Sequence, residues 1–361
     1  MLSSDELAIL WLEIFEFLTI NKKQDIVKCF ESPSDMYENF TSKKTEILKH
    51  LSSEQFDKMV RMKNSNSINK YLKFLQDNGI KFTTCYSNDY PEFLFDYENY
   101  PLILYYKGDL DLVYTDCVGV VGTRKYTRYG ERVTEKYCAT LVKNGVTIVS
   151  GFAEGIDSIA SKTAIKNNGK TIAIIGSGLK CIYPKSNEKF ADEVAKKGLL
   201  LSEYPPYMKA QTFHFPQRNR LIAGFSKCVL ITEAGIKSGV MYTKDFALEY
   251  GKEVFVVPGN IDSESSKGTN AIIKSLQGSI TIEPNDILEF LNLTDSSLNL
   301  DDKQELSSQE MLILDCIGAQ ETHFNEIQIK TKIDTKILLT LLTTMELKGI
   351  IKKLAGNYYA K

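Results

Sequence analysis

The first 66 residues alternate short apolar stretches of helical periodicity with polar breaks. Apolar residues spaced three and four apart form one stripe along a helix, which a small domain buries against its neighbours. We therefore predict an all-helical N-terminal domain over residues 1–66. Its expected helices are Glu6–Leu18, Lys23–Phe30, Thr45–His50 and Ser53–Met62.

After a further helical stretch from Ser67, the pattern changes to near-continuous runs of valine, isoleucine and leucine that end in glycine. Such runs are typical of parallel strands buried on both faces, and their alternation with helices is typical of a doubly wound sheet. We predict an α/β core over residues 67–290, with a Rossmann-like doubly wound, mostly parallel sheet. The strand-like runs are 118–122, 147–151, 171–176, 199–203, 229–235 and 253–259.

The last part of the chain has a different pattern. Residues 291–306 are polar and rich in serine, asparagine and aspartate, which predicts a linker. In residues 307–361, three helical stretches precede a hairpin, an order that is typical of a winged-helix domain. The expected elements are helices at Ser308–Ile317, Asn325–Lys332 and Thr335–Lys348, and a hairpin that turns at residues 355–357.

The net charge of −2 conceals an uneven distribution along the chain. Residues 117–282 hold 23 Lys and Arg against 14 Asp and Glu, a balance of +9. Residues 1–116 hold 13 against 19, and residues 283–361 hold 8 against 13, so both flanks are acidic. A positive balance confined to the core favours a polyanionic partner. A lysine-rich solvated surface would give the same count.

Other features argue against membrane, secreted and metal-dependent classes. No apolar run approaches the roughly 20 residues needed to cross a bilayer, so we expect no membrane partner. The seven cysteines are scattered singly without a CxxC pair, which predicts free thiols and a cytoplasmic location. His50, His214 and His323 are far apart in sequence, so we expect no metal site, and we expect no cofactor.

In an open parallel sheet, ligands bind at the carboxyl ends of the strands, and the glycine-rich segments of this chain follow those ends. Gly122 lets the backbone turn off its strand, and Arg124 and Arg128 follow it before a helix expected near Glu131. Amides at a helix N-terminus together with arginines predict a phosphate site. The pattern is neither GxGxxG nor a Walker motif, which disfavours dinucleotide and P-loop functions.

Further segments supply candidate ligand groups at the same edge. The segment Phe213–Gly224, which we expect to be a loop, places arginines beside aromatic rings, as suits a phosphate and a base together. The alternative for Arg218 or Arg220 is an ion pair with a strand-end carboxylate such as Glu203 or Glu233. The candidate binding residues are Gly122, Arg124, Ser150, Gly151, Gly176, Gly178, Lys185, Asn187, Arg218, Asn219, Arg220, Ser238 and Gly239.

The strings VGTR, SGFAEGID, TIAIIGSG, IYPKSN, FPQRNRLIAG, EAGIKSG and VPGN occur in this order. Together they closely resemble the signature series of the DprA/Smf family of DNA-processing proteins, and the helical start and winged-helix end fit that family as well. The resemblance implies a bacterial recombination mediator, not an enzyme. Such a protein binds single-stranded DNA, protects it, forms a homodimer and helps to load the RecA recombinase during natural transformation or related DNA uptake and recombination.

The resemblance also assigns residues. It places Arg124, in VGTR, and Lys185, in IYPKSN, in the family's binding pocket. For Arg218, Asn219 and Arg220, in FPQRNR, it leaves open whether they touch DNA or brace the pocket.

Two other classes of function are compatible with the fold. A nucleotide hydrolase that cleaves an N-glycosidic bond needs an acid–base carboxylate, for which Glu154, Asp157, Glu203 and Glu233 are candidates. The PGGxGTxxE string expected of such enzymes is missing, however. A protein-interaction scaffold with purely structural glycine loops would not explain the +9 balance of the core.

Overall fold

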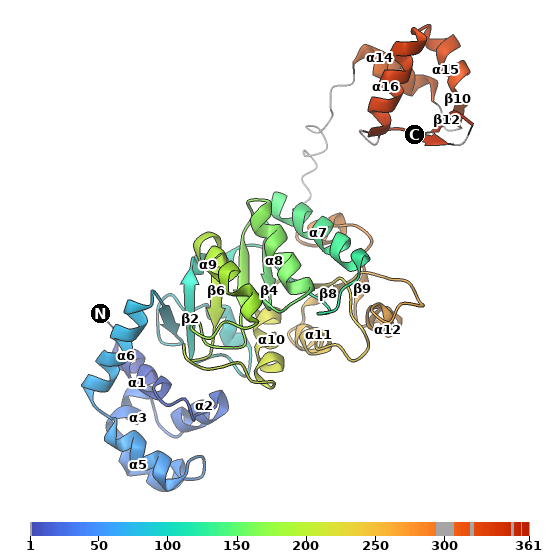
Figure 1. The fold of residues 1–361 in the computed structure, drawn as a ribbon. Helices are drawn as coiled ribbons and strands as arrows, with labels where there is room; N and C mark the ends of the chain where they lie inside the picture. The colour runs from blue at the N-terminus through green and yellow to red at the C-terminus, as the bar shows by residue number, and fades with distance from the viewer. Residues whose placement is uncertain (1, 294–306, 318–320, 348–349, 355, 361) are drawn as a thin grey trace. The chain divides into compact units, whose positions relative to one another are not determined.

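The structure is a computed structural model that describes residues 2–293, 307–317, 321–347, 350–354 and 356–360 (Figure 1). The chain divides into two compact units, Met1–Leu293 and Thr294–Lys361. The predicted linker lies outside the described residues from 294 onward, as do Lys348 and Ala355 of the predicted C-terminal elements.

Six short α-helices begin the first unit. The four predicted helices are present, and three of them, α1, α2 and α5, begin after a serine or threonine whose hydroxyl accepts a hydrogen bond from a backbone amide of the first turn. Ser3, for example, accepts a hydrogen bond from the Glu6 amide at 3.2 Å while its own amide donates to the Glu6 carboxylate at 2.6 Å. The helices are α1 (Ser4–Glu13), α2 (Ile20–Lys28), α3 (Pro33–Asn39), α4 (Lys44–Ile47), α5 (Ser53–Arg61) and α6 (Ser65–Asp77).

The sheet of the first unit has nine strands in the order β1-β2-β6-β5-β4-β3-β7-β8-β9. Pairing is parallel from β6 through β9, whereas β2 is antiparallel to both β1 and β6. The prediction of a mostly parallel α/β sheet is therefore confirmed. The strands are β1 (Lys81–Thr84), β2 (Ile103–Gly108), β3 (Cys117–Val121), β4 (Thr147–Ser150), β5 (Thr171–Ile174), β6 (Leu199–Ser202), β7 (Cys228–Ile231), β8 (Glu253–Val256) and β9 (Ser279–Ile280).

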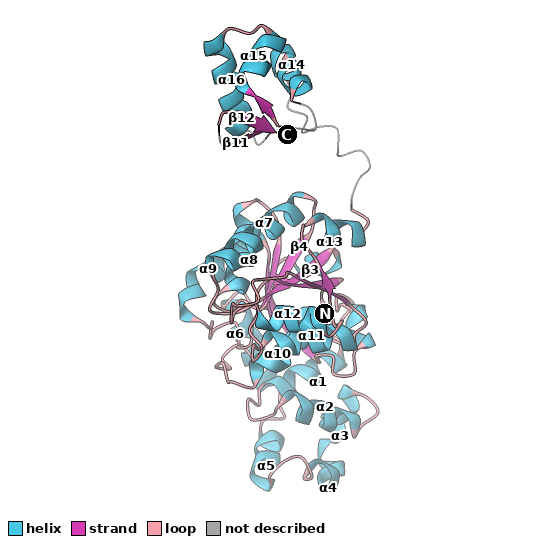
Figure 2. Ribbon diagram, turned by 90° about the vertical axis from the view of Figure 1, so that its right-hand side faces the viewer, coloured by secondary structure: helices cyan, strands magenta, loops and turns pink. Residues whose placement is uncertain are grey.

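Helices cover both faces of this sheet (Figures 1 and 2). α7, α8 and α9 lie on one face, and α10, α11 and α12 lie on the other. Strand order runs outward from β3 to β6 and then resumes at β7 on the other side of β3, so the segments that follow β3 and β7 leave the sheet toward opposite faces. Such a reversal opens a crevice at the carboxyl ends of the two strands. The helices are α7 (Arg128–Lys143), α8 (Ile156–Lys166), α9 (Glu188–Lys197), α10 (His214–Gly224), α11 (Val240–Glu249), α12 (Lys267–Lys274) and α13 (Asn285–Phe290).

One element of the core contradicts the sequence-based expectation. Phe213–Gly224 was expected to be a loop, but α10 occupies all of it except Phe213. Pro216 is the third residue of the helix, and a proline is tolerated in a first turn because its missing N–H would have no intrahelical partner there. α7 likewise begins three residues before Glu131, where the Thr127 hydroxyl accepts a hydrogen bond from the Gly130 amide at 3.1 Å.

The N-terminal helices and the sheet share one hydrophobic core, in which Trp11 and Phe40 belong to the same cluster as Tyr105 and Leu200. The predicted domain boundary at residue 66 stays a prediction. Among the described residues, no helix is both long and apolar enough to span a bilayer.

The described residues of the second unit form three helices and a small antiparallel sheet. Its core gathers one apolar face from each helix, with Ile313, Ile327 and Leu342 buried against Tyr359. The predicted order of three helices and a hairpin is confirmed. The elements are α14 (Ser308–Cys316), β10 (Thr322–His323), α15 (Phe324–Thr331), α16 (Thr335–Leu347), β11 (Lys352–Leu354) and β12 (Tyr358–Ala360).

Candidate nucleic-acid interface

The carboxyl ends of β3 and β7 open into a cavity of about 910 Å³, which we call the main cavity. Its walls come from the segment between β3 and α7, from α10, and from the segment between β7 and α11. It therefore occupies the crevice that the reversal of strand order predicts. The residues that line it include Gly122, Arg124, Lys125, Asp157, Tyr183, Phe215, Arg218, Asn219, Lys237, Ser238, Gly239 and Tyr242.

Arg124 is an exposed cation on the wall of the main cavity. Its guanidinium carbon lies 5.3 Å from the centre of the Phe215 ring, within the range of a cation–π contact. The backbone at Gly122 lies very close to Ile156, at the start of α8. Any other residue at position 122 would place its Cβ 2.7 Å from the Cβ of Ile156, which is too close, so only glycine fits here. The backbone can therefore turn close to α8 and present Arg124 to the cavity.

Arg218 lies at the floor of the same cavity but is buried. Its Nη1 donates to the carbonyl oxygens of Gly151 and Ile174, and a side chain on Gly151 would lie 2.7 Å from its Nη2. Burial lowers the pKa of Arg218 to about 10, and the neighbouring Asp157 opposes that shift. The guanidinium thus stays protonated at neutral pH, braces two strand ends and adds positive charge to the floor.

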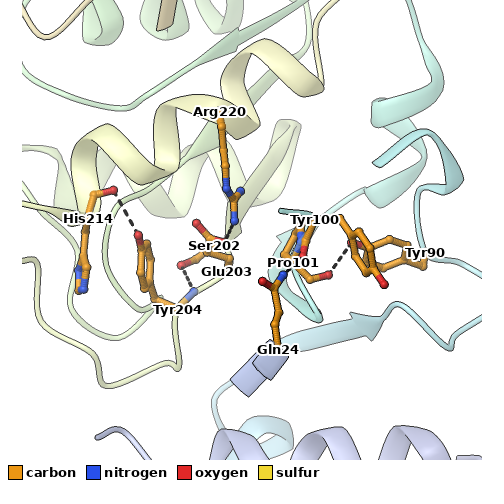
Figure 3. Close-up of polar contacts among 9 residues, drawn as sticks. All are labelled: Gln24, Tyr90, Tyr100, Pro101, Ser202, Glu203, Tyr204, His214 and Arg220. Atoms are coloured by element: carbon orange, nitrogen blue, oxygen red, sulfur yellow. Dashed lines mark hydrogen bonds and ion pairs between the residues drawn. The ribbon is translucent and has the colours of Figure 1, made fainter. Parts of the chain in front are cut away.

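Arg220 points away from the main cavity, and the ion-pair alternative considered from the sequence is confirmed for it. It forms a buried ion pair with Glu203, to which it reaches from α10 (Figure 3). Burial raises the pKa of Glu203, and Arg220 opposes the shift. Arg220 therefore braces the fold beneath the cavity.

Asn219, Ser238 and Gly239, three of the candidate binding residues, line the main cavity. The Asn219 amide nitrogen donates to the Gly239 carbonyl at 3.2 Å, and this bond joins α10 to the start of α11. Ser238 and Gly239 immediately precede Val240, the first residue of α11. The positive end of that helix dipole consequently faces the cavity.

Four predicted residues hold the backbone rather than line the main cavity. The buried Ser150 hydroxyl donates to the Val120 carbonyl at 2.8 Å. The buried Asn187 amide donates to the Phe152 carbonyl at 3.0 Å. Gly176 and Gly178 let neighbouring segments of the chain approach closely. A Cβ on Gly176 would press against the Phe215 ring, and a Cβ on Gly178 would collide with the Pro205 carbonyl oxygen.

Lys185 is exposed at the start of a short 3-10 helix, Lys185–Asn187. It is not among the residues that line the main cavity. The preceding Tyr183 and Pro184 line a small hollow together with Arg124 and Phe215, so the two predicted cations lie on segments that meet there.

The cations around the main cavity are not neutralised by neighbours. Within the described part of the chain, no ion pair forms to Arg124, Lys125, Lys185 or Lys237. Lys125 and Lys237 were missed from the sequence, as were the exposed rings of Tyr183 and Tyr242. Each of these four residues lies within three positions of a candidate binding residue in the sequence. That proximity is the sequence signal by which they could have been predicted.

The four carboxylates considered as catalytic candidates do not converge. Glu203 pairs with Arg220, and Glu233 accepts hydrogen bonds from the Thr127 amide and hydroxyl at 2.9 and 2.7 Å. Of the four, Asp157 alone lines the main cavity, where burial raises its pKa against the effect of Arg218. Backbone amides of Ala153 and Gly122 also donate to Asp157. In the described residues, no cluster of His, Cys, Asp and Glu is placed to hold a metal ion.

Comparison with known proteins identifies relatives of both units. Residues 81–292 match the model of the family described as DNA recombination-mediator protein A, and residues 301–357 match that of the DprA winged helix domain. Protein Smf of Escherichia coli is 35% identical over 302 residues, which cover 81% of this chain and 80% of that protein. DNA processing protein DprA of Streptococcus pneumoniae is 41% identical over 201 residues, 56% of this chain and 71% of that one.

Solved structures show the same similarity. The crystal structure of DprA from Streptococcus pneumoniae aligns with a TM-score of 0.66 at 30% identity, over 80% of this chain and 98% of that one. DNA processing protein A from Helicobacter pylori, described for its single-stranded-DNA binding mode, aligns with a TM-score of 0.54 at 33% identity, over 59% and 96%. The chain thus belongs to the DprA/Smf family of DNA-processing recombination mediators.

Proposed function

We propose that this chain binds single-stranded DNA in the main cavity with little sequence preference. The observation that carries the proposal is the set of unpaired cations around a cavity that also presents exposed aromatic rings. Arg124, Lys125 and Lys237 offer charge to phosphates, while Tyr183 and Tyr242 offer faces to bases. Cationic grooves with aromatic platforms bind single strands because every unpaired base has a face to stack.

The recessed aromatic rings of the main cavity disfavour the binding of double-stranded DNA. Bases in a duplex are already stacked on one another, so rings in a recessed cavity cannot reach them without unpairing. Contacts to phosphate carry no sequence information directly, and stacking tolerates any base. The Helicobacter pylori relative, named for its single-stranded-DNA binding mode, is consistent with this proposal.

The experiment is a fluorescence anisotropy titration with oligonucleotides of equal length. We expect single strands of mixed, thymine-rich and cytosine-rich sequence to bind with dissociation constants within a few-fold of one another. A duplex of the mixed sequence should bind much more weakly. Equal affinity for duplex and single strand would contradict the proposal.

The proposal also holds that the chain is not an enzyme. The carboxylates of the region support this part of the proposal. Asp157 is buried and accepts hydrogen bonds from backbone amides. Glu203 pairs with Arg220, and Glu233 accepts hydrogen bonds from Thr127. Prolonged incubation of DNA and nucleotides with the protein, followed by chromatography, should yield no new product. A product abolished by Asp157→Asn would contradict it.

A homodimer is part of the proposed function, and the outer edge of the sheet is its candidate interface. Among the described residues, β9 ends the sheet and pairs with β8 alone, so no strand of that part of the chain pairs with its other edge. Leu276 and Ile282 flank it, 92% and 73% exposed, and Ile280 lies on it. A free strand edge beside apolar side chains favours pairing with a second copy.

Light scattering after gel filtration tests the interface. We expect a dimer that Ile282→Glu converts to a monomer, because the new carboxylate would have to be buried between the copies. Ile329→Glu, at an equally exposed isoleucine of α15, is the matched control and should stay dimeric. A dimeric Ile282→Glu variant would place the interface elsewhere.

Finally, we propose that the protein acts in the cytoplasm, protects the bound strand and helps to load the RecA recombinase. The seven cysteines are all unpaired, as a reducing compartment favours. The family membership supports the recombinase role. In a strand-exchange assay on DNA precoated with a single-strand-binding protein, we expect this protein to shorten the delay before RecA acts. An unchanged delay would contradict the role.

A further inference from the structure

A second hollow, of about 520 Å³, adjoins the main cavity. We call it the side hollow. Its lining residues are Thr127, Tyr129, Glu233, Gly259, Ser263 and Ser266, with Pro258 and Asn260. Three segments, 121–129, 233–240 and 258–266, contribute residues to both spaces, so a strand bound in the main cavity passes close to the side hollow.

The side hollow differs from the main cavity in charge. No lysine or arginine is among its lining residues, and it contains the Glu233 carboxylate. Both oxygens of that carboxylate already accept hydrogen bonds from Thr127. A phosphate placed there would meet a like charge without a cation to balance it. The side hollow therefore suits a neutral part of a nucleotide.

Tyr129 gives the side hollow a fixed aromatic face. Its hydroxyl donates to the Pro258 carbonyl at 2.8 Å, which holds the ring against the opposite wall. The residue is nevertheless 38% exposed. The Arg132 guanidinium carbon lies 6.0 Å from the ring centre, so a flat partner such as a nucleobase would stack on the other face of the ring.

Ser266 adds an unused polar group. The residue as a whole is only 3% exposed, but its hydroxyl is not one of the fully buried polar atoms that lack a partner in the described part of the chain. A side chain on Gly259 would collide with that hydroxyl, so glycine keeps the space in front of it open. Ser266 lines the side hollow, and a hydroxyl that is not fully buried there is available to a ligand.

We propose that the side hollow receives a nucleobase of the same strand whose phosphates bind in the main cavity. The base would stack on Tyr129 and hydrogen-bond to Ser266. The volume of about 520 Å³ lies within the range of about 300–1,000 Å³ typical of small-ligand sites. This inference rests on the proposed function, and it adds a site for one base beside the main cavity.

The test uses oligonucleotides carrying 2-aminopurine, whose fluorescence falls when the base stacks, and matching oligonucleotides with abasic positions. We expect the wild-type protein to quench 2-aminopurine at one position of the bound strand. Tyr129→Ala should remove that quenching and weaken binding about 5-fold to 100-fold, the range for losing one stacked base. Tyr129→Phe keeps the ring and should retain the quenching. Ser266→Ala should shift affinity less than Tyr129→Ala.

Tyr114→Ala is the matched control. Tyr114 is an exposed tyrosine that precedes β3, at the amino end of the parallel strands and therefore at the opposite edge of the sheet. This variant should bind and quench as wild type. An abasic strand should bind wild-type protein and Tyr129→Ala equally.

The outcomes separate the two proposals. If the protein binds no single strand, the proposed function fails. If it binds single strands but Tyr129→Ala, folded by circular dichroism, keeps full affinity and quenching, the side-hollow inference alone is overturned. Equal binding of abasic and intact strands by the wild-type protein would overturn it as well.

Discussion

Replacing Arg220 with alanine should lower the free energy of unfolding by about 3–5 kcal/mol, the usual result of removing one partner from a buried ion pair. Glu203 would then be a buried carboxylate without its ion-pair partner, between the sheet and the N-terminal helices (Figure 3). Denaturant unfolding followed by circular dichroism measures the loss. Lys197→Ala, which breaks the exposed Lys197–Glu193 pair, is the control and should cost less than about 1 kcal/mol.

The pH dependence of this defect has a defined sign. Burial already raises the pKa of Glu203 in the folded protein, and removing Arg220 removes the main opposing influence. A carboxyl whose folded pKa is raised favours the folded state when protonated and opposes it when charged. The defect of Arg220→Ala should therefore shrink as the pH falls toward the raised pKa. A loss that is small, or that grows at acidic pH, would contradict the assignment of Arg220 as a brace.

Arg124→Ala and Lys185→Ala should each weaken single-strand binding by about 1–3 kcal/mol, the range for charge-assisted contacts, without unfolding the protein. Both side chains are exposed and unpaired, so little folding stability depends on them. Arg124→Lys should recover part of the affinity, because it restores the charge but not the planar group over Phe215.

Lys227→Ala provides the matched control for these two variants. It removes one positive charge of the core at Lys227, which pairs with Asp116 at the amino end of β3. Affinity should change little in this variant. Normal binding by an Arg124→Ala, Lys185→Ala double variant would show that the interface lies elsewhere.

The fold was predictable because most strands of the parallel sheet are short, continuous runs of apolar residues. Runs such as 118–121 and 172–175 contain no polar side chain, as is typical of a strand that is buried on both faces of a sheet. α3 was missed because Pro33–Asn39 offers only Met36 and Tyr37 as apolar positions, although Ser32 before Pro33 is a helix-start signal. β9 was missed because two residues are too few for periodicity.

The candidate interface was only partly predictable. The position of Arg124 at the carboxyl edge of the sheet could be predicted, because the residue comes just after a buried strand and a glycine that turns the chain out of the sheet. Arg218 and Arg220 lie two residues apart on one helix, and sequence alone does not say which one faces the cavity floor and which meets Glu203. That choice depends on the rotation of α10 against the sheet, which is set by packing.

The most direct test of the account is the salt dependence of single-strand affinity. Dissociation constants measured between about 50 and 200 mM salt should rise steeply, with a logarithmic slope of about 0.7 for each phosphate neutralised. Arg124→Ala should reduce that slope by about 0.7, the contribution of one phosphate contact. Tyr129→Ala should leave the slope unchanged, because it removes no charge. A slope near zero for the wild-type protein would contradict the claim that its unpaired cations bind the phosphates of a single strand.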